Sequence, residues 1–337
     1  MSIDIVIEFL VLKNIRYKKN ISLSEYSYFR TGGNVKLIVM PTTIEGLTDV
    51  INFLNNGDYS YKVVGATSNI LFLDDESYSI IISTRGYNEI NINHEQRLTT
   101  VSAGLMVPKF SKKLSSLGYT GFEGLLGIPG TIGGAIYMNA GAYGNSISDL
   151  LVSVTIVEPD GVIKLIDRNE IDFSFRKSSL QNTGRHIIEA SFLINSANQN
   201  YINNINKDNM SNRLKFQEKK LPNLGSLFAT FDIYKDISRN NIIYSYLLLF
   251  IRLIYIITKS DNNKLLNKIT CLYFGWKFET QSYSDKTLNC IVNRGQHTNE
   301  ILGYIFTLRK IISSDVHIEN EVYSEKTSSL LHEFPDT

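Results

Sequence analysis

Glycine is the residue type that is distributed least evenly along this chain. Nine of the 22 glycines lie between Gly118 and Gly144, and six recur at every third position, from 118 to 133. Collagen is excluded, because the repeat is short and Pro129 is its only proline. No Walker lysine follows these glycines, and no G-x-G-x-x-G sequence opens the run after a strand. The common nucleotide-binding motifs are therefore absent.

The centre of the cluster, from Gly127 to Gly144, has the composition of a loop that approaches a ligand closely. Glycine lacks a Cβ, so its backbone can turn N–H groups toward a bound molecule. Such N–H groups bind an anion without a cationic side chain. The isoleucines and alanines between the glycines could flank a flat ring. We interpret the stretch as a ligand-binding loop; a packing turn between strands is the alternative.

A second loop of small residues, Gly65 to Ile70, follows an expected strand and precedes an apolar run. Ser68 and Asn69 can donate hydrogen bonds to phosphate, and several small residues in succession form an anion-binding nest. Taken alone, the loop could equally be an ordinary polar turn. Two anion-suited loops about 60 residues apart indicate an extended diphosphate cofactor.

The overall composition limits the other possibilities. The 34 Lys and Arg residues balance 33 Asp and Glu residues, which argues against a dedicated nucleic-acid-binding surface. Cys271 and Cys290 cannot build a disulfide scaffold and are expected to pack in the core. The five histidines are scattered, so no metal site is predicted. A cytoplasmic protein of two or three domains fits a chain of 337 residues with this composition.

Hydrophobic periodicity predicts strands and helices that would carry the two loops. The turn from Glu158 to Gly161 is expected to join two strands in a hairpin, since proline presets one torsion angle and glycine supplies a positive φ. Strands are predicted at 35–40, 61–64, 78–83, 98–102, 152–157, 162–166 and 187–194. Helices are predicted at 46–56, 107–117 and 298–312.

Two further apolar segments raise the question of membrane contact. Residues 1–13 are interrupted by Asp4 and Glu8 and lack a preceding positive charge, so we expect a docking helix and no signal peptide. Residues 242–257 fall short of the roughly 20 residues that a spanning helix needs, and Arg252 lies within them. A buried helix is favoured there, and a membrane-surface or partner-facing helix is the alternative.

Six segments, in their order along the chain, resemble motifs of the UDP-N-acetylenolpyruvoylglucosamine reductases, the flavoenzymes of peptidoglycan precursor synthesis. The resemblance of the long glycine-rich stretch is almost complete and highly specific, whereas Phe175 stands where tyrosine is usual in the arginine motif. The resemblance runs from about residue 24 to residue 323. The segments are Tyr28–Gly33, Gly65–Leu71, Gly127–Gly144, Phe173–Ser178, Pro222–Phe228 and Ile318–Val322.

The resemblance implies an α+β fold with a two-subdomain FAD-binding domain of the PCMH or vanillyl-alcohol-oxidase type, followed by a smaller α+β substrate-binding domain. Residues 196–212 are rich in asparagine and poor in large apolar side chains, which places a domain boundary near residue 198. The expected parts are an N-terminal helix (1–23), the FAD-binding domain (24–197, with subdomains of about 24–85 and 86–197), the substrate-binding domain (198–325) and a tail (326–337).

The resemblance also implies FAD as cofactor, NADPH as reductant and a UDP-sugar enolpyruvyl ether as substrate. NADPH reduces the flavin, which passes hydride to the alkene carbon; the carbanion formed beside the substrate carboxylate then needs charge stabilisation and a proton. The cofactor contacts that the resemblance implies are Gly65, Ala66, Thr67, Ser68, Asn69, Ile70, Gly127, Pro129, Gly130, Thr131, Gly133, Gly134, Asn139 and Gly141.

Three catalytic residues follow from the same resemblance. Arg176 would bind the carboxylate bidentately, and Glu321 would act near it if protonated or shared in a hydrogen bond. Ser226 would deliver the proton, helped by positive charge from Arg176 or Lys277. Taken singly, Arg176 would be a surface ion-pair partner, Ser226 a cap or turn residue and Glu321 a solvated acid. Only their joint order along the chain favours catalysis.

The chain departs from the family pattern at several positions. Ala229 and Thr230 replace a lysine and an asparagine, Ala66–Thr67 replaces two glycines, and Phe278 replaces the glycine after Lys277. We therefore expect an intact flavin site and an altered nucleotide-sugar site, with Lys277 and Thr230 as candidate substrate contacts. The alternatives are a paralogous flavoenzyme that acts on another nucleotide sugar and a non-catalytic FAD-binding descendant.

Overall fold

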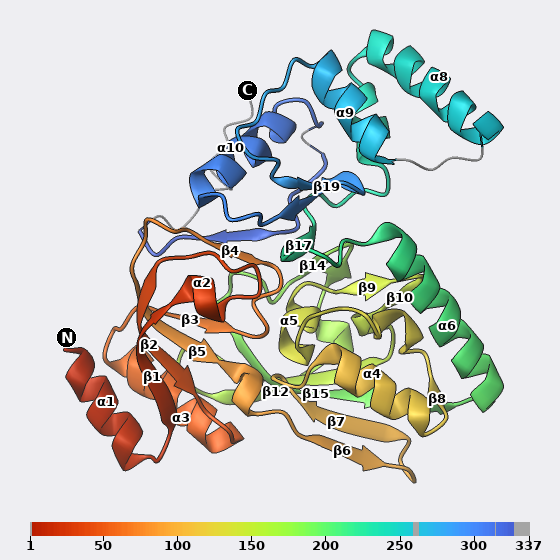
Figure 1. The fold of residues 1–337 in the computed structure, drawn as a ribbon. Helices are drawn as coiled ribbons and strands as arrows, with labels where there is room; N and C mark the ends of the chain where they lie inside the picture. Colours follow the sequence, from red (N-terminus) through yellow and green to blue (C-terminus); the bar gives the residue numbers. More distant parts are fainter. Residues whose placement is uncertain (1, 259–262, 314, 327–337) are drawn as a thin grey trace. The chain divides into compact units, whose positions relative to one another are not determined.

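The computed structural model describes residues 2–258, 263–313 and 315–326 (Figure 1). The chain forms two compact units, each assembled from segments that are separate in the sequence. Unit 1 contains the chain up to residue 22 with residues 34–67 and 77–215, and unit 2 contains residues 23–33, 68–76 and the chain from residue 216. Each unit has its own hydrophobic core.

The first half of unit 1 is a four-stranded sheet covered on one face by two helices. Its elements are α1 (Ile3–Leu12), β1 (Arg16–Ser22), β2 (Asn34–Met40), α3 (Ile44–Asn56), β3 (Tyr61–Val64) and β5 (Tyr78–Ser83). The strand order is β1-β2-β5-β3, with β1 antiparallel and the others parallel. Leu10 of α1 and Leu47 of α3 pack in one cluster with Leu37 and Ile80 of the sheet. This arrangement places the end of β3, and the loop after it, at the edge of the core.

The local signals predicted most of this half correctly. Pro41 ends β2, and the Thr43 side chain caps α3 by accepting a 3.1 Å hydrogen bond from the Gly46 N–H, so the helix begins two residues before the predicted start. The expected N-terminal helix over residues 1–23 is wrong in its second half. The helix ends at Leu12, and residues 16–22 form β1, because they pair with β2 along the whole strand.

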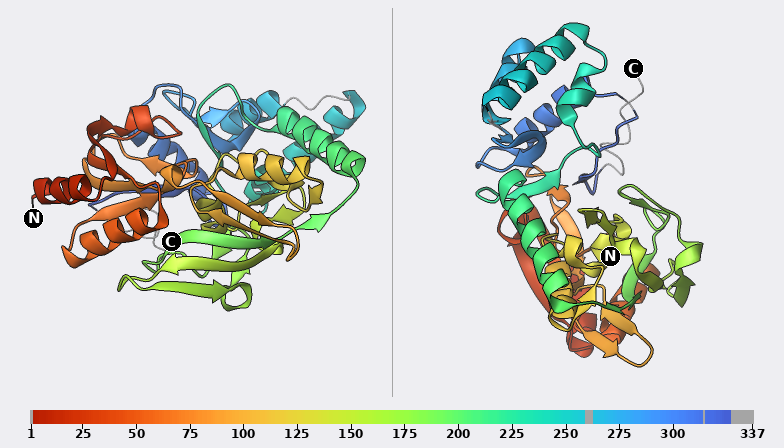
Figure 2. Two further views of the ribbon diagram at one scale, coloured as in Figure 1. Left: turned by 90° about the horizontal axis from the view of Figure 1, so that it is seen from below. Right: turned by 90° about the vertical axis from the view of Figure 1, so that its right-hand side faces the viewer.

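The second half of unit 1 is a five-stranded antiparallel sheet that packs against α4 and α5 (Figure 2). Its strands are β6 (Ile90–Asn93), β7 (Leu98–Ser102), β11 (Leu151–Val157), β12 (Ile163–Asp167) and β15 (His186–Leu193), and its helices are α4 (Val107–Ser116) and α5 (Ile132–Tyr137). The order is β12-β11-β15-β7-β6. The predicted hairpin is confirmed: β11 and β12 pair, and the Gly161 N–H donates to the Glu158 carbonyl at 2.8 Å. The rings of Phe110 and Phe122 meet edge to face in the core, with their centroids 5.0 Å apart.

Helix α6 (Gln199–Phe216) occupies the asparagine-rich segment, and it belongs to unit 1 up to residue 215. The division between the units therefore falls at 215/216 and not at the expected 197/198. Ile202, Asn209 and Arg213 are all buried, so three spaced side chains attach a polar helix to the unit. The composition of this segment indicated a linker because most of its turns face solvent.

Unit 2 is built on a three-stranded antiparallel sheet and a separate parallel pair of strands. Its elements are α2 (Leu23–Tyr26), β4 (Ile70–Phe72), β17 (Asn223–Ser226), α7 (Ile233–Ser238), α8 (Ile242–Thr258), α9 (Asn263–Tyr273), β18 (Tyr283–Ser284), β19 (Thr287–Val292), α10 (Thr298–Arg309) and β20 (Glu321–Tyr323). The sheet order is β17-β19-β18, and β20 pairs with β4. Both cysteines are buried in this unit, as predicted, and burial raises the pKa of the Cys290 thiol to about 12.

Helix α8 corresponds to the predicted apolar helix, but it is not a buried one. Tyr244, Leu248 and Ile251 face the core of unit 2, while the opposite side of the helix is exposed. Arg252 forms an ion pair with Asp232 within the unit. In the described part of the chain, no helix has the length and apolar character needed to cross a bilayer.

Candidate active site

The glycine-rich stretch folds as a turn followed by the short helix α5, and main-chain hydrogen bonds fix it to the segment after β7. The Ile132 and Gly133 N–H groups donate to the carbonyls of Leu105 and Ala103, both at 2.9 Å. Thr131, which is 1% exposed, caps α5 and accepts a 3.4 Å hydrogen bond from the Gly134 N–H. The stretch is therefore rigid before any ligand arrives, as preorganised binding loops are.

The two predicted cofactor loops lie in direct contact. A Cβ placed on Gly65 would lie 2.1 Å from Oγ1 of Thr131, closer than any side chain allows. Gly65 follows β3 directly, whereas Thr131 begins α5. Glycine is thus required at position 65 by the neighbouring loop, which ties two segments 66 residues apart into one surface.

The loop after β3 presents main-chain donors. Thr67 adopts a left-handed conformation with φ of 56° and is 5% exposed. Within the described residues, the N–H groups of Ala66, Ser68 and Asn69 donate to no acceptor. Successive N–H groups around a left-handed residue form the concave nest that binds anions. The loop has the donors, but not the lysine, of a phosphate site.

Asn139, in unit 1, has a hydrogen-bond acceptor without a donor among the described residues. Its Nδ2 donates to the Ser174 carbonyl at 2.8 Å, while its Oδ1 is buried and finds no donor among the described residues. Its φ is 43°, a left-handed value that asparagine tolerates better than most residues. A buried amide oxygen without a donor costs about 1–3 kcal/mol unless a ligand supplies one.

Arg176 is held against the glycine-rich stretch. It lies in a tight turn between β13 (Phe173–Ser174) and β14 (Lys177–Ser178), with φ of 60°. Its guanidinium donates to the Gly141 carbonyl at 2.8 Å and lies 5.0 Å from the Phe175 ring. Two predicted site residues, Arg176 and Gly141, therefore meet in unit 1.

Arg213 was missed by the sequence reasoning, although it contacts the same stretch. From α6, its guanidinium donates to the Gly124 carbonyl at 2.8 Å and lies 5.2 Å from the Tyr143 ring. A Cβ on Gly127 would lie 2.4 Å from Arg213 Cδ, so the glycine makes room for the arginine. Burial lowers the pKa of this guanidinium. One charged residue among several in a polar helix gave no signal that would distinguish it from a surface residue.

In unit 2, Asn320 links the segments that carry Ser226 and Glu321. Its Nδ2 donates to Oδ1 of Asn69 at 2.8 Å and to the Leu224 carbonyl at 2.9 Å, and its Oδ1 is buried without a donor among the described residues. The Glu321 N–H donates to the Asn69 carbonyl at 2.9 Å. Ser226 is exposed at the end of β17. Asn320, which the sequence reasoning did not single out, thus ties Asn69 to the strand that carries Ser226 and lies next to Glu321 in the chain.

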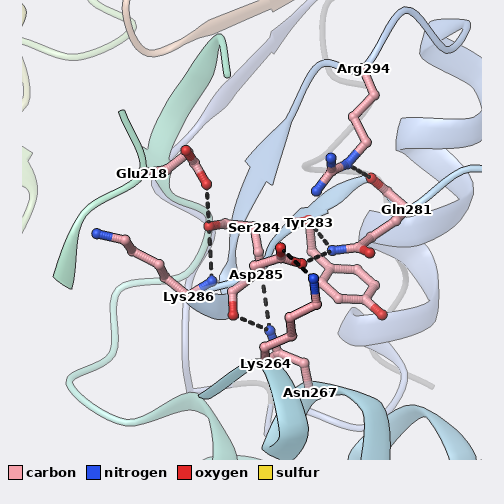
Figure 3. A network of polar contacts seen from close by, with 9 residues as sticks. All are labelled: Glu218, Lys264, Asn267, Gln281, Tyr283, Ser284, Asp285, Lys286 and Arg294. Carbon is pink, nitrogen blue, oxygen red and sulfur yellow. Dashed lines mark hydrogen bonds and ion pairs between the residues drawn. The ribbon is translucent and has the colours of Figure 1, made fainter. Parts of the chain in front are cut away.

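The serine motif is supported from β19. Asn289 makes a reciprocal pair with the backbone of Phe228: its Oδ1 accepts at 2.8 Å and its Nδ2 donates at 2.9 Å. The turn between β18 and β19 carries a polar network (Figure 3) in which Ser284 donates to Glu218 at 2.7 Å and Lys264 pairs with Asp285 at 3.0 Å. Burial opposes ionisation of Glu218, but the hydrogen bonds from Ser284 and three main-chain N–H groups outweigh it and lower the pKa.

The two candidate substrate contacts, Thr230 and Lys277, differ in their hydrogen bonding and exposure. The Thr230 hydroxyl bonds to the Asp236 carboxylate and accepts from the Asp232 N–H at 3.1 Å, so it is engaged in the start of α7. Lys277 is exposed between Trp276 and Phe278, whose rings pack on the core of unit 2. Thr230 is therefore held by neighbours in its own unit, whereas the Lys277 side chain is exposed to solvent; the substrate contacts of both stay predictions.

Known proteins resemble this chain in both sequence and fold. A family model described as an FAD binding domain matches residues 35–167. The chain is 32% identical over 216 residues to a UDP-N-acetylenolpyruvoylglucosamine reductase from a Nostoc species. The matched region covers 64% of this chain and 65% of that protein. It is 35% identical over 217 residues to the reductase of Prochlorococcus marinus, covering 64% of this chain and 75% of that protein.

A crystal structure of the UDP-N-acetylenolpyruvylglucosamine reductase from Thermus caldophilus superposes with a TM-score of 0.67 at 22% identity, over 92% of this chain and all of that one. The matched domain and this likeness define an FAD-binding α+β fold. The chain belongs to the UDP-N-acetylenolpyruvoylglucosamine reductase family. The match to the Nostoc relative spans just under two thirds of that protein's length.

Proposed function

We propose that this protein reduces the enolpyruvyl ether of UDP-N-acetylglucosamine to UDP-N-acetylmuramate, with FAD as its bound cofactor and NADPH as reductant. The observation that carries the proposal is the contact between Gly65 and Thr131, which joins the loop after β3 to the glycine-rich stretch. The family membership supplies the reaction. A location in the cytoplasm, where NADPH and nucleotide sugars are available, follows from that function.

The residues present fit a flavin dinucleotide. The N–H groups of Ala66, Ser68 and Asn69, which have no acceptor among the described residues, suit the diphosphate. Within unit 1, the amide oxygen of Asn139 has no donor among the described residues and suits a ligand that carries N–H or O–H groups. When bound, the flavin would supply the hydride that the alkene carbon receives.

The protein's own part is to stabilise charge and deliver a proton. We infer that Arg176, fixed by its hydrogen bond to Gly141, binds the substrate carboxylate, beside which negative charge develops. Ser226 gives its proton to the adjacent carbon; its hydroxyl is exposed at the end of a strand and has no partner among the described residues. By the family resemblance, Glu321 of unit 2, whose N–H bonds to Asn69, is assigned a hydrogen bond to the substrate.

Anaerobic half-reactions test the proposal. NADPH should bleach the flavin of the purified protein, and the enolpyruvyl substrate should then restore its colour. Ser226→Ala should leave the first step unchanged and slow the second by about 10²–10⁴-fold, because only the second needs the proton. Flavin that is reduced but never reoxidised by this substrate would refute the assignment. Ser24→Ala, in α2, is a matched control that should leave both steps unchanged.

A second candidate is the same chemistry on a different nucleotide sugar. It is favoured by the engagement of Thr230 with Asp236, which removes a side chain from substrate contact at a position where the family usually has asparagine. A thermal-shift series of UDP-sugars separates the two candidates: the larger shift should come from the true substrate.

A further inference from the structure

Helix α8 carries an apolar face that the described part of its unit leaves uncovered. In Figure 1 the helix lies at the outer edge of unit 2, with α9 along its inner side. Its inner face supplies Tyr244, Leu248 and Ile251 to the core. Eight large apolar side chains on the other face are 49–80% exposed: Ile242, Ile243, Tyr246, Leu249, Phe250, Leu253, Ile256 and Ile257.

The spacing of these side chains is that of a helix-packing seam. Ile243, Tyr246, Phe250, Leu253 and Ile257 follow one another at intervals of three and four residues, which is the a/d pattern of a heptad. A second row, formed by Ile242, Leu249 and Ile256, repeats every seven residues beside it. Such a stripe fits the grooves of another helix with the same periodicity.

The area of the face matches one side of a stable dimer. At roughly 150 Å² for each large apolar side chain, the eight expose on the order of 800 Å². A standard interface buries about 800 Å² per partner, and the uncovered apolar patches of monomers rarely exceed a few hundred Å². The face is therefore large enough to hold two chains together without help from other elements.

Charge favours a protein partner over a lipid surface. Helices that lie on membranes carry several Lys or Arg residues at the margin of the apolar face. The only charged residue of α8 is Arg252, and it is paired with Asp232. A face without charge calls for a partner face without charge, and the same face on a second copy meets that requirement by symmetry.

We propose that α8 is the interface of a homodimer, in which the seam of one chain packs against the seam of its partner about a two-fold axis. Phe250 lies at the middle of α8 and therefore near that axis. This proposal does not depend on the reaction that the protein catalyses.

Sedimentation velocity of the full chain over a concentration series tests the dimer. The double variant Phe250→Glu/Leu253→Glu should raise the dimer dissociation constant by at least about a hundredfold, because it would bury carboxylates in an apolar seam. Leu12→Glu is the matched control, since Leu12 is an 82% exposed leucine at the end of another helix; it should dimerise like the original chain. Far-ultraviolet circular dichroism checks that each variant is folded.

Oxidative cross-linking gives an independent result if the double variant fails to fold. Phe250→Cys should form a disulfide-linked dimer, whereas Leu12→Cys at the same concentration should not, and both native cysteines are buried. A monomeric original chain, a double variant that dimerises equally, or a Phe250→Cys protein that does not cross-link would each overturn the proposal. Cosedimentation of a monomeric original chain with phosphatidylcholine–phosphatidylglycerol vesicles, lost in the double variant, would assign the face to a membrane and overturn it too.

Discussion

Substitution of Gly65 by alanine tests the contact on which the cofactor site is built. The added Cβ would lie 2.1 Å from Thr131 Oγ1 and 3.2 Å from two further atoms of that side chain. Normal contact begins near 3.4 Å, so one of the two loops must shift by more than an ångström. Thr131 cannot move freely, because it is 1% exposed and caps α5.

The expected cost follows from overpacking at a rigid site. Forcing an extra carbon into such a contact lowers the free energy of unfolding by about 1–3 kcal/mol. The displaced loop would also lose one main-chain hydrogen bond to a bound diphosphate. At about 1.5–3 kcal/mol for each hydrogen bond to a charged group, FAD affinity should fall by roughly tenfold to a few hundredfold.

Gly134→Ala provides the control within the same glycine-rich stretch. Its added Cβ meets no atom nearer than 3.5 Å, and alanine favours the helix that Gly134 occupies. Urea unfolding of the cofactor-free proteins should therefore show Gly65→Ala destabilised and Gly134→Ala unchanged or more stable. Quenching of flavin fluorescence on titration measures the affinity of Gly65→Ala against the original chain.

A rescue experiment separates the clash from a general effect of alanine. Thr131→Ala removes the oxygen that the new Cβ would meet, at the cost of about 1 kcal/mol for the lost cap. In the Gly65→Ala background, the second substitution should cost less than it does alone, and it should recover part of the FAD affinity. Additive losses in the double variant, or equal stability of Gly65→Ala and Gly134→Ala, would refute the proposed contact.

Two further predictions concern stability. Burial, with the positive charge of Lys62, lowers the pKa of His186 to about 4. The unfolded chain therefore binds a proton at this histidine below pH 6.5, whereas the folded chain binds it only near pH 4. The contribution of neutral His186 to the free energy of unfolding is therefore complete above pH 6.5 and declines by up to about 3 kcal/mol as the pH falls to 4. Urea unfolding at several pH values should show a shallower decline of this free energy for His186→Gln. Equal slopes for the variant and the original chain would contradict the prediction. Arg213→Met should lower the free energy of unfolding by about 2–4 kcal/mol, since it leaves the Gly124 carbonyl without its buried donor. Arg239→Met, at a half-exposed arginine of unit 2, should cost below 1 kcal/mol.

Those parts of the fold with local signals could be predicted from the sequence. The strands 61–64, 78–83 and 98–102 have the predicted bounds, because short runs of β-branched residues end at glycine or serine. Strand β1 was missed because its sequence, Arg-Tyr-Lys-Lys-Asn-Ile-Ser, shows no apolar alternation and gains its conformation from pairing with β2.

The candidate site residues likewise fall into those with a local sequence signal and those without one. The Gly65 and Gly127–Gly144 loops were recognised because their residue types are unusual in themselves. Arg213 and Asn320 were not, since an arginine or asparagine becomes significant only when distant segments fold around it. The exposed face of α8 was missed for a similar reason: its apolar residues run almost all round the helix, and the sequence does not say which side the core covers.

The discontinuous make-up of unit 2 has a consequence for how the chain matures on the ribosome. Strand β4 is made early, but β20, with which it pairs in parallel, is made about 250 residues later. At roughly 5–20 residues per second, the first strand waits on the order of ten seconds or more for its neighbour. Its backbone groups stay open to foreign partners throughout that delay. A shortened fragment that begins at residue 216 would never meet β4 and would lack a strand that no later synthesis can restore.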